Sequence, residues 1–288
     1  MFAGRKSNLF SDVLLTVDFD RTLTSPDGKI PQRNIEAIRY FMENGGTFTV
    51  NTGRSVNTFK AHIDEVPVNA PLLLYNGSAM WENGKLVNCH EIDLPVWETL
   101  DWVQEAFPDV TLEVQAVDTH YFIHHHPGAV PYYNKMGWDF KVAEHGQDLG
   151  PFLKFAIFGE TCTDTVAGFF QGTEEEFAYF RYIEQAIMAR YGDKVDTFLA
   201  TPKILDVQPK GVSKIRVARE LQAKLGKKIL VCVGDAENDV VMLRGADYAF
   251  CPADGVVAAQ FPNVCPCGQG AVADVIYKKI PEILQGKP

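Results

Sequence analysis

The sequence lacks any long apolar run. A membrane-spanning helix needs about 20 mostly apolar residues. The longest charge-free stretch of about that length, residues 255–273, is interrupted by prolines, glutamines and glycines. The first residues include Arg5 and Lys6, but no apolar segment of signal-peptide length follows them. We therefore expect no membrane partner, no secretory signal and a cytoplasmic location.

The sequence also has few positive charges and few cysteines. It contains 27 Lys and Arg against 37 Asp and Glu, and no run of Lys and Arg exceeds two residues. Because nucleic-acid binding depends on positive charge, we expect no nucleic-acid partner. The six cysteines are scattered apart from Cys265 and Cys267. A zinc site usually needs a second pair or histidines at ligand spacing, so we expect an inert loop there.

The sequence does contain alternating strand and helix patterns over its 288 residues, a length that predicts about two domains. Short apolar runs at 13–17, 47–50, 72–75 and 229–233 are typical of strands buried on both faces of a parallel sheet. Helical spacing of apolar residues separates several of them. The pattern predicts an α/β fold with a doubly wound, Rossmann-like parallel sheet.

A middle segment has a different pattern. Strand-like segments with aromatic alternation occur near 120–123 and 154–158, and a long helix is expected from Thr173 to Tyr191. The parallel α/β pattern returns from about Ile204. We therefore predict a core domain formed by residues 1–87 and 201–288, with an α+β domain inserted at 88–200.

Two carboxylates follow the first strand directly. Asp18 and Asp20 are two residues apart, so in an extended chain they point to the same side. Buried carboxylates this close repel each other unless one is protonated or a cation lies between them. This spacing suggests a metal ligand and nucleophile at Asp18 and a proton donor and acceptor at Asp20. The alternative is a solvated strand end.

Two further features follow other predicted strands or begin a helix. Thr52 offers a hydroxyl next to a helix start, and Gly53 allows close backbone approach, so the pair can hold a phosphate. The alternative is an ordinary helix cap. Lys214, with Lys210 nearby, can neutralise a phosphate, although a solvated surface lysine has the same appearance.

A second acidic feature follows the apolar strand at 229–233. The segment 234–239 places three acids and one amide within five residues. Mg²⁺ prefers oxygen ligands and needs only one or two protein carboxylates, so it would offset their repulsion. Ligands bind at the carboxyl ends of strands in an open α/β sheet. These features together therefore predict a phosphoryl-transfer site, whereas an acidic loop is the alternative for this segment alone.

In these motifs the sequence resembles the haloacid dehalogenase (HAD) superfamily of phosphatases, and within it the Cof-type subgroup that carries a large α/β cap. The resemblance spans roughly residues 12–275 and keeps the motifs in order. The matching segments are Asp18-Phe19-Asp20-Arg21-Thr22, Thr52-Gly53-Arg54, Asn76-Gly77, Gly211-Val212-Ser213-Lys214 and Gly234-Asp235-Ala236-Glu237-Asn238-Asp239.

The resemblance implies a role for each motif. Asp18 would attack phosphorus and become an aspartyl phosphate, and Asp20 would protonate the leaving oxygen and then activate water. The transferring phosphoryl group would be bound by Thr52, Gly53 and Lys214. The match at Gly211-Val212-Ser213-Lys214 favours Lys214 over Lys210 as the phosphate-binding lysine. The implied Mg²⁺ ligands are Asp18, the backbone carbonyl of Asp20 and Asp235, and Asn238 and Asp239 would complete and support that metal site.

One residue departs from the family pattern. Arg21 stands where the family usually has a glycine that permits a tight turn. Arg21 either points to solvent or contacts substrate or cap. With Arg54 and Asn238 it forms the set of candidate substrate contacts.

The inserted domain is where members of this family set substrate choice, and its sequence is less informative. The tract His124–His126 is a weak candidate for metal or substrate contact, with a structural role favoured. Its aromatic residues are expected to be mostly core, because aromatic side chains bury large areas. The expected core residues are Tyr132, Tyr133, Trp138, Phe140, Phe177, Phe180 and Ile183.

The sequence therefore predicts a Mg²⁺-dependent phosphatase that hydrolyses a small phosphate monoester, such as a sugar phosphate. Two alternatives stay open. A phosphomutase would move phosphate within a sugar through similar residues, and a non-catalytic protein could use the same scaffold to bind a ligand. The oligomeric state does not follow from the sequence.

Overall fold

The computed structural model describes residues 8–117, 119–163, 165 and 171–286, so Arg5 and Lys6 lie outside the described residues. The chain forms two compact units. The first comprises Met1–Gly53, Ala61–Val87 and Ser213–Pro288, and the second comprises Arg54–Lys60 and Asn88–Val212. Within the described residues, no helix combines the length and apolar character needed to cross a membrane.

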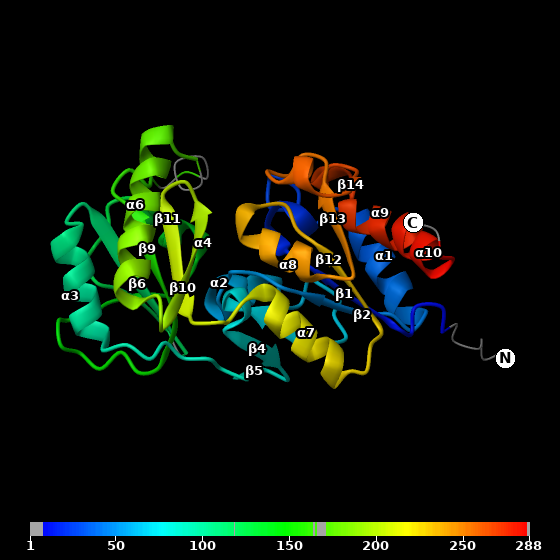
Figure 1. Ribbon diagram of the computed structural model, residues 1–288, viewed down its shortest axis with the longest axis horizontal. Helices are drawn as coiled ribbons and strands as arrows, with labels where there is room; N and C mark the ends of the chain where they lie inside the picture. Colours follow the sequence, from blue (N-terminus) through cyan, green and yellow to red (C-terminus); the bar gives the residue numbers. More distant parts are fainter. Residues whose placement is uncertain (1–7, 118, 164, 166–170, 287–288) are drawn as a thin grey trace. The chain divides into compact units, whose positions relative to one another are not determined.

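The first unit contains a parallel five-stranded sheet of order β14-β13-β12-β1-β2 (Figure 1). A three-stranded antiparallel sheet, β3-β4-β5, joins it through a parallel bridge between Asn51 and Leu73. The strands are β1 (Val13–Val17), β2 (Thr47–Val50), β3 (Leu72–Leu74), β4 (Ala79–Glu82), β5 (Lys85–Val87), β12 (Ile229–Val233), β13 (Tyr248–Pro252) and β14 (Asn263–Val264).

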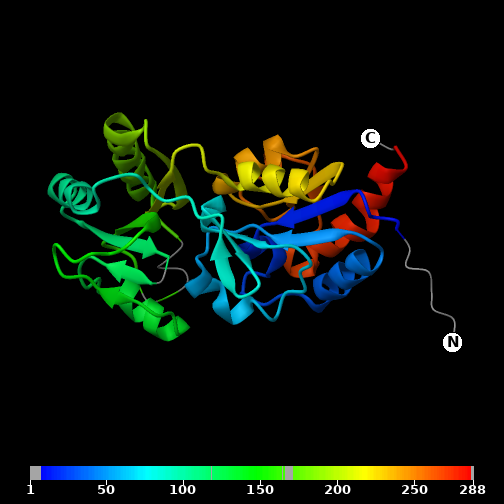
Figure 2. The same ribbon diagram turned by 90° about the horizontal axis from the view of Figure 1, so that it is seen from below.

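Helices cover both faces of this parallel sheet, as Figure 2 shows from below. One layer contains α1 (Gln32–Glu43), α9 (Ala271–Asp274) and α10 (Ile280–Leu284), and the other contains α7 (Lys214–Lys224) and α8 (Val240–Gly245). Every residue of β1 and β2 is buried, as expected for strands covered on both faces. The predicted doubly wound α/β fold is confirmed.

The second unit contains a mostly antiparallel six-stranded sheet of order β10-β11-β9-β6-β7-β8. Helices α3 and α6 pack on one face and α4 on the other (Figure 2). The elements are α2 (Val56–Phe59), α3 (Val96–Ala106), β6 (Val110–Ala116), β7 (His120–Phe122), α4 (Ala129–Met136), β8 (Lys141–Val142), β9 (Phe152–Gly159), α6 (Glu174–Tyr191), β10 (Val195–Thr201) and β11 (Ile204–Pro209).

Three details differ from the sequence expectations. The parallel pattern does not return at Ile204, because β11 pairs antiparallel with β9 and β10 and so belongs to the second unit's sheet. The helix after Thr52, which its sequence pattern predicts to run to about Glu65, is shorter: α2 ends at Phe59 and a 3₁₀ turn follows at Lys60–His62. Phe177 is 41% exposed rather than core, and the Arg181 guanidinium lies over its ring.

The long helix predicted for the second unit is present, and several of its predicted core residues are buried. Thr173 and Glu176 cap α6 reciprocally, and Phe180 and Ile183 are buried. Tyr132 and Tyr133 are buried in a cluster against which Trp138 and Phe140 pack. Tyr132 and Tyr133 are therefore core, as predicted, whereas Trp138 and Phe140 are only partly buried.

Candidate active site

The carboxyl end of β1 fixes the first acid. The backbone N–H of Asp18 donates to the carbonyl of Val233, the last residue of β12, at 2.9 Å. The Asp18 side chain is therefore held beside the loop that follows the neighbouring strand. The chain next turns tightly through Asp20 and Arg21, and Arg21 adopts φ 57°. That left-handed conformation favours glycine, so the backbone at Arg21 is strained.

The loop after β12 fixes two further acids. Oδ2 of Asp239 accepts the backbone N–H groups of Asp235 and Ala236, at 3.0 and 3.2 Å. This closes the loop into a tight turn. The hydroxyl of Thr22 donates to Oδ1 of Asp235 at 3.0 Å, which ties the turn after β1 to the loop after β12.

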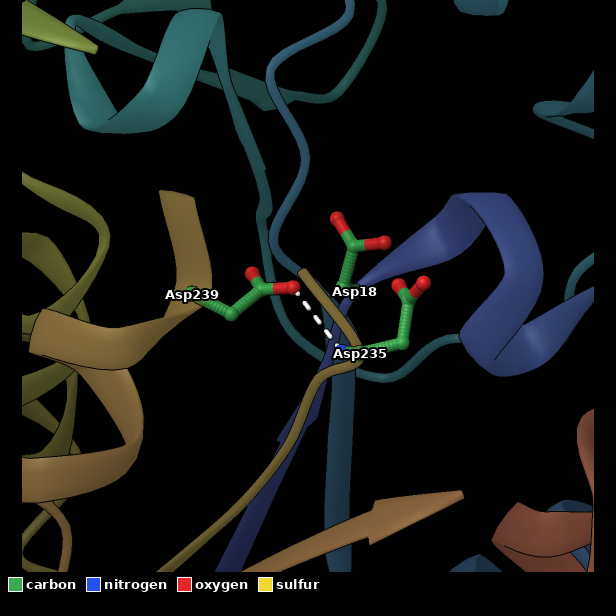
Figure 3. A group of neighbouring side chains, drawn as sticks. All are labelled: Asp18, Asp235 and Asp239. Carbon is green, nitrogen blue, oxygen red and sulfur yellow. Dashed lines mark hydrogen bonds between the residues drawn. The ribbon is translucent and has the colours of Figure 1, made fainter. Parts of the chain in front are cut away.

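The three carboxylates converge on one point (Figure 3). One oxygen from each of Asp18, Asp235 and Asp239 lies within 4.8 Å of the others, and the side chains come from two adjacent strand ends. At most 6% of any of the three residues is exposed. The ammonium group of Lys214 contacts Oδ1 of Asp18 at 2.6 Å and Oδ1 of Asp239 at 2.7 Å.

The charges in this group do not balance, because one lysine faces three acids. Burial, with the neighbouring acids Asp239 and Asp235, raises the pKa of Asp18 well above its usual range despite Lys214. Burial and the charge of Asp239 raise the pKa of Asp235 to about 7. Burial opposes the charge of Lys214, but Asp18 and Asp239 outweigh it and raise its pKa. Raised carboxyl pKa values are what a missing positive charge produces.

The loop after β2 carries the predicted phosphate-binding residues. Thr52 is buried, its N–H donates to the carbonyl of Leu73, and its carbonyl accepts from Asn76. A Cβ on Gly53 would lie 2.7 Å from the Asn76 side-chain oxygen, so any larger residue there would require the Asn76 side chain to move. Asn51 donates from Nδ2 to the carbonyl of Lys214 at 2.9 Å. The loop is thus tied to the start of α7.

The structure therefore brings together the strand-end acids and Lys214, and ties the Thr52 loop to them. Thr22, Asn51 and Asn76 support the site without having been assigned roles from the sequence. The signal for both was available, because Asn51 directly follows β2 and Asn76 lies two residues after the end of β3.

The remaining candidates differ in position. Arg21 follows Asp20 and is exposed, and Asn238 lies in the loop after β12 and is half-buried. Arg54 belongs to the second unit, where its guanidinium lies 5.7 Å from the centre of the Trp138 ring. Lys210 pairs with Asp196 in the second unit at 2.7 Å. Cys265 and Cys267 are free thiols.

The histidine tract has no strand geometry, since β7 ends at Phe122. His126 is buried, and its Nδ1 accepts the N–H groups of Gly128 and Ala129 at the start of α4. His124 contacts Gln104 at the surface. The structural role expected for this tract therefore holds for His126.

Comparisons with known proteins point to one fold. The family model for haloacid dehalogenase-like hydrolases matches residues 15–260. An uncharacterised hydrolase from Schizosaccharomyces pombe is 24% identical over 290 residues, which cover 92% of this chain and 90% of the relative.

Solved structures agree, and at these identities they show the fold alone. A haloacid dehalogenase-like hydrolase from Bacteroides thetaiotaomicron has a TM-score of 0.75 at 17% identity, over 92% of this chain and 98% of that one. A protein described as a HAD subclass IIB sugar phosphatase has a TM-score of 0.73 at 17% identity, over 93% of this chain and 99% of that one.

Proposed function

Because the chain belongs to the haloacid dehalogenase-like hydrolase family, we propose that it is a Mg²⁺-dependent phosphatase that hydrolyses a small phosphate monoester, such as a sugar phosphate. The observation that carries the proposal is the buried contact of Asp18 with Lys214 beside two further acids. The sugar phosphatase that shares the fold supports the choice of substrate class.

The donor set fits Mg²⁺. Its oxygens are carboxylates at strand ends, and a bound cation would offset the burial and the mutual repulsion that raise the pKa values of Asp18 and Asp235. We assign the ion to Asp18, Asp235 and the backbone carbonyl of Asp20, with Asp239 and Asn238 supporting that set. Bound there, Mg²⁺ would offset the negative charge of the phosphate oxygens and of the acids.

The first chemical step belongs to Asp18 and Asp20. A carboxylate oxygen of Asp18 attacks phosphorus, a new P–O bond forms, and the bond to the leaving oxygen breaks. Asp20 donates its proton to that oxygen, so a neutral alcohol departs. Lys214 and the Thr52 hydroxyl bind the phosphoryl oxygens, where negative charge must be stabilised.

The second step hydrolyses the aspartyl phosphate. Asp20, now ionised, takes a proton from a water molecule, the water oxygen attacks phosphorus, and the P–O bond to Asp18 breaks. Inorganic phosphate leaves, and both aspartates return to their starting states. Thr22 and Asp239 act through other groups in both steps, because they hold Asp235 and Lys214 in place.

The test is phosphate release from phenyl phosphate, with Mg²⁺ and with EDTA, by the wild type and by Asp18→Asn. We expect turnover that EDTA abolishes and that the variant lowers by roughly a thousandfold or more. Turnover that survives in Asp18→Asn would contradict the assigned nucleophile. Turnover that is unaffected by EDTA would contradict the metal.

A further inference from the structure

Asn51 stands directly after β2 and is completely buried. Its main chain is held on both sides. The N–H donates to the carbonyl of Val17 at 2.8 Å, and the residue forms the bridge to Leu73 that joins the two sheets of the first unit. A side chain that starts from so rigid a base can fix the position of the group that it contacts.

The amide group of Asn51 contacts the residue that carries the site's lysine. Its Nδ2 donates to the backbone carbonyl of Lys214 at 2.9 Å, and both residues belong to the first unit. Lys214 is the first residue of α7, so its carbonyl already accepts an N–H from the next turn of that helix. The bond from Asn51 is therefore an additional one, which ties the start of α7 to the end of β2.

The position of the first turn of α7 determines where the Lys214 ammonium group lies. That group is 2.6 Å from Oδ1 of Asp18 and 2.7 Å from Oδ1 of Asp239, and the Lys214 side chain is 2% exposed. Because the backbone of a helical turn moves as a rigid piece, a shift at the Lys214 carbonyl also displaces its side chain. The bond from Asn51 thus limits how far the ammonium group can move from the carboxylate of Asp18.

Stability alone does not account for an asparagine at this position. Its Oδ1 is buried and has no hydrogen-bond partner in the part of the chain that the structure describes, and its Nδ2 also lies 3.6 Å from the sulfur of Met242. Rotating the amide by half a turn would only place Oδ1 against the carbonyl oxygen of Lys214. Since a buried acceptor without a partner costs free energy, an apolar side chain would avoid that cost.

Another buried asparagine of the first unit, Asn34 in α1, shows the structural use of the same amide. Its Nδ2 donates to the carbonyl of Leu23 at 2.9 Å, and its Oδ1 accepts the N–H of Ala273 at 3.0 Å. Asn34 is as fully buried as Asn51. It joins α1 to the turn after β1 and to α9, so it serves as a matched control.

We propose that Asn51 is a positioning residue for Lys214, which it holds at the distance from Asp18 where both can engage one phosphoryl group. The inference rests on the proposed phosphatase function and adds a residue that touches neither the reacting group nor the metal ligands. Asn51 also directly precedes Thr52. One short piece of backbone therefore anchors two phosphate-binding groups, the Thr52 hydroxyl directly and the Lys214 ammonium through the Asn51 amide.

The first experiment is a double-mutant cycle on the turnover of phenyl phosphate. Asn51→Ala should lower kcat/KM about tenfold in the wild-type background. In the Lys214→Met background it should lower kcat/KM by less than about twofold, because no ammonium group is left to misplace. Asn51→Thr, which is close to asparagine in volume and suits a strand end, takes the place of Asn51→Ala if that variant does not fold.

The control and the contrary outcomes are equally specific. Asn34→Ala should change kcat/KM by less than about twofold in both backgrounds. It should lower the urea midpoint of unfolding more than Asn51→Ala does, because it leaves a carbonyl and an N–H without a partner, whereas the Lys214 carbonyl keeps its helical one. Equal losses of kcat/KM from Asn51→Ala in both backgrounds, no loss in either, or the reverse order of midpoints would overturn the proposal.

A second experiment does not depend on catalysis. Calorimetric titration in the presence of Mg²⁺ measures the Kd of inorganic phosphate. Asn51→Ala should raise this Kd about fivefold in the wild-type background and leave it unchanged beside Lys214→Met. If Lys214→Met has no effect on turnover, the proposed function fails, and this titration still decides the role of Asn51. An unchanged Kd, or an equal rise in both backgrounds, would overturn the proposal.

Discussion

Each unit of the molecule buries a group of carboxylates, but the two groups have opposite electrostatics. In the first unit, burial and neighbouring acids raise the pKa values of Asp18 and Asp235. In the second unit, burial also opposes the charge of Glu113, but His120, Gln115 and Tyr133 outweigh it and lower its pKa. The first group is short of positive charge and suits a cation. In the second group, Glu113 already accepts hydrogen bonds from protein donors, so it holds the ring of its neighbour His120 in place.

The largest expected effect concerns the lysine of the first group. Lys214→Met should lower the turnover of phenyl phosphate by roughly a thousandfold, because it removes the charge that contacts Asp18 and binds the phosphoryl group. The matched control is Lys210→Met, which changes an exposed lysine paired with Asp196 and should leave turnover within about twofold. Equal losses in both variants would contradict the assignment of Lys214.

The next effect separates the two groups by stability. Glu113→Leu should lower the free energy of unfolding by about 3–5 kcal/mol, because it leaves His120 and Gln115 without their acceptor. Asp235→Asn should not destabilise the metal-free protein, because it removes a carboxylate that is repelled by its neighbours. Urea unfolding in EDTA measures both. Destabilisation by Asp235→Asn as large as that by Glu113→Leu would contradict the difference in electrostatics between the two groups of carboxylates.

The pH dependence of stability should also differ in sign. The folded-state pKa of Asp235 is raised to about 7, so the folded protein holds a proton that the unfolded chain has lost above pH about 4. In EDTA, its contribution to stability is therefore lost as the pH rises from about 4 to 7. Glu113 has a lowered pKa, so its contribution is lost as the pH falls below its usual range.

Melting temperatures of wild type, Asp235→Asn and Glu113→Gln across this pH range test these signs. The decline between pH about 5 and 7 should weaken in Asp235→Asn and persist in Glu113→Gln. Added Mg²⁺ should raise the melting temperature more at the upper end of the range, where its ligands are deprotonated. A stabilisation by Mg²⁺ that does not change with pH would contradict proton-linked binding at Asp235.

The smallest expected effect concerns the backbone between the two acids of the first motif. Arg21 holds φ 57° without a glycine, so Arg21→Gly should raise the free energy of unfolding by about 1 kcal/mol, or less once the entropy of glycine is included. Arg21→Ala is the control, because it removes the guanidinium but keeps the strain. Equal stability changes in the two variants would show that the charge, and not the backbone, matters.

The sequence predicted the first group well and missed the second, for a physical reason. Asp18, Thr52 and Asp235 each follow a buried strand, and parallel strands bring such residues to one edge of the sheet whatever the rest of the fold does. Glu113 and Lys154 lie within strands. Their contact partners depend on which strands pair and in which register, and no local pattern gives that.

The boundary near Ile204 illustrates the same limit. The run Ile204–Val207 has the composition of a buried strand, and nothing in it indicates antiparallel pairing with β9 rather than a return to the parallel sheet. Nothing in the sequence distinguishes His120 from the nearby tract at 124–126, for a similar reason. Its neighbour Glu113 is seven residues away in sequence, and only the pairing of β6 with β7 brings them together.

Asp239 uses its two oxygens for two different tasks. One closes the loop after β12 through two backbone N–H groups, and the other accepts from Lys214. Asparagine has one acceptor oxygen and glutamate is one methylene longer, so neither serves both tasks. The position therefore leaves no room for gradual change, because any replacement must lose the closed loop, the contact with Lys214 or both.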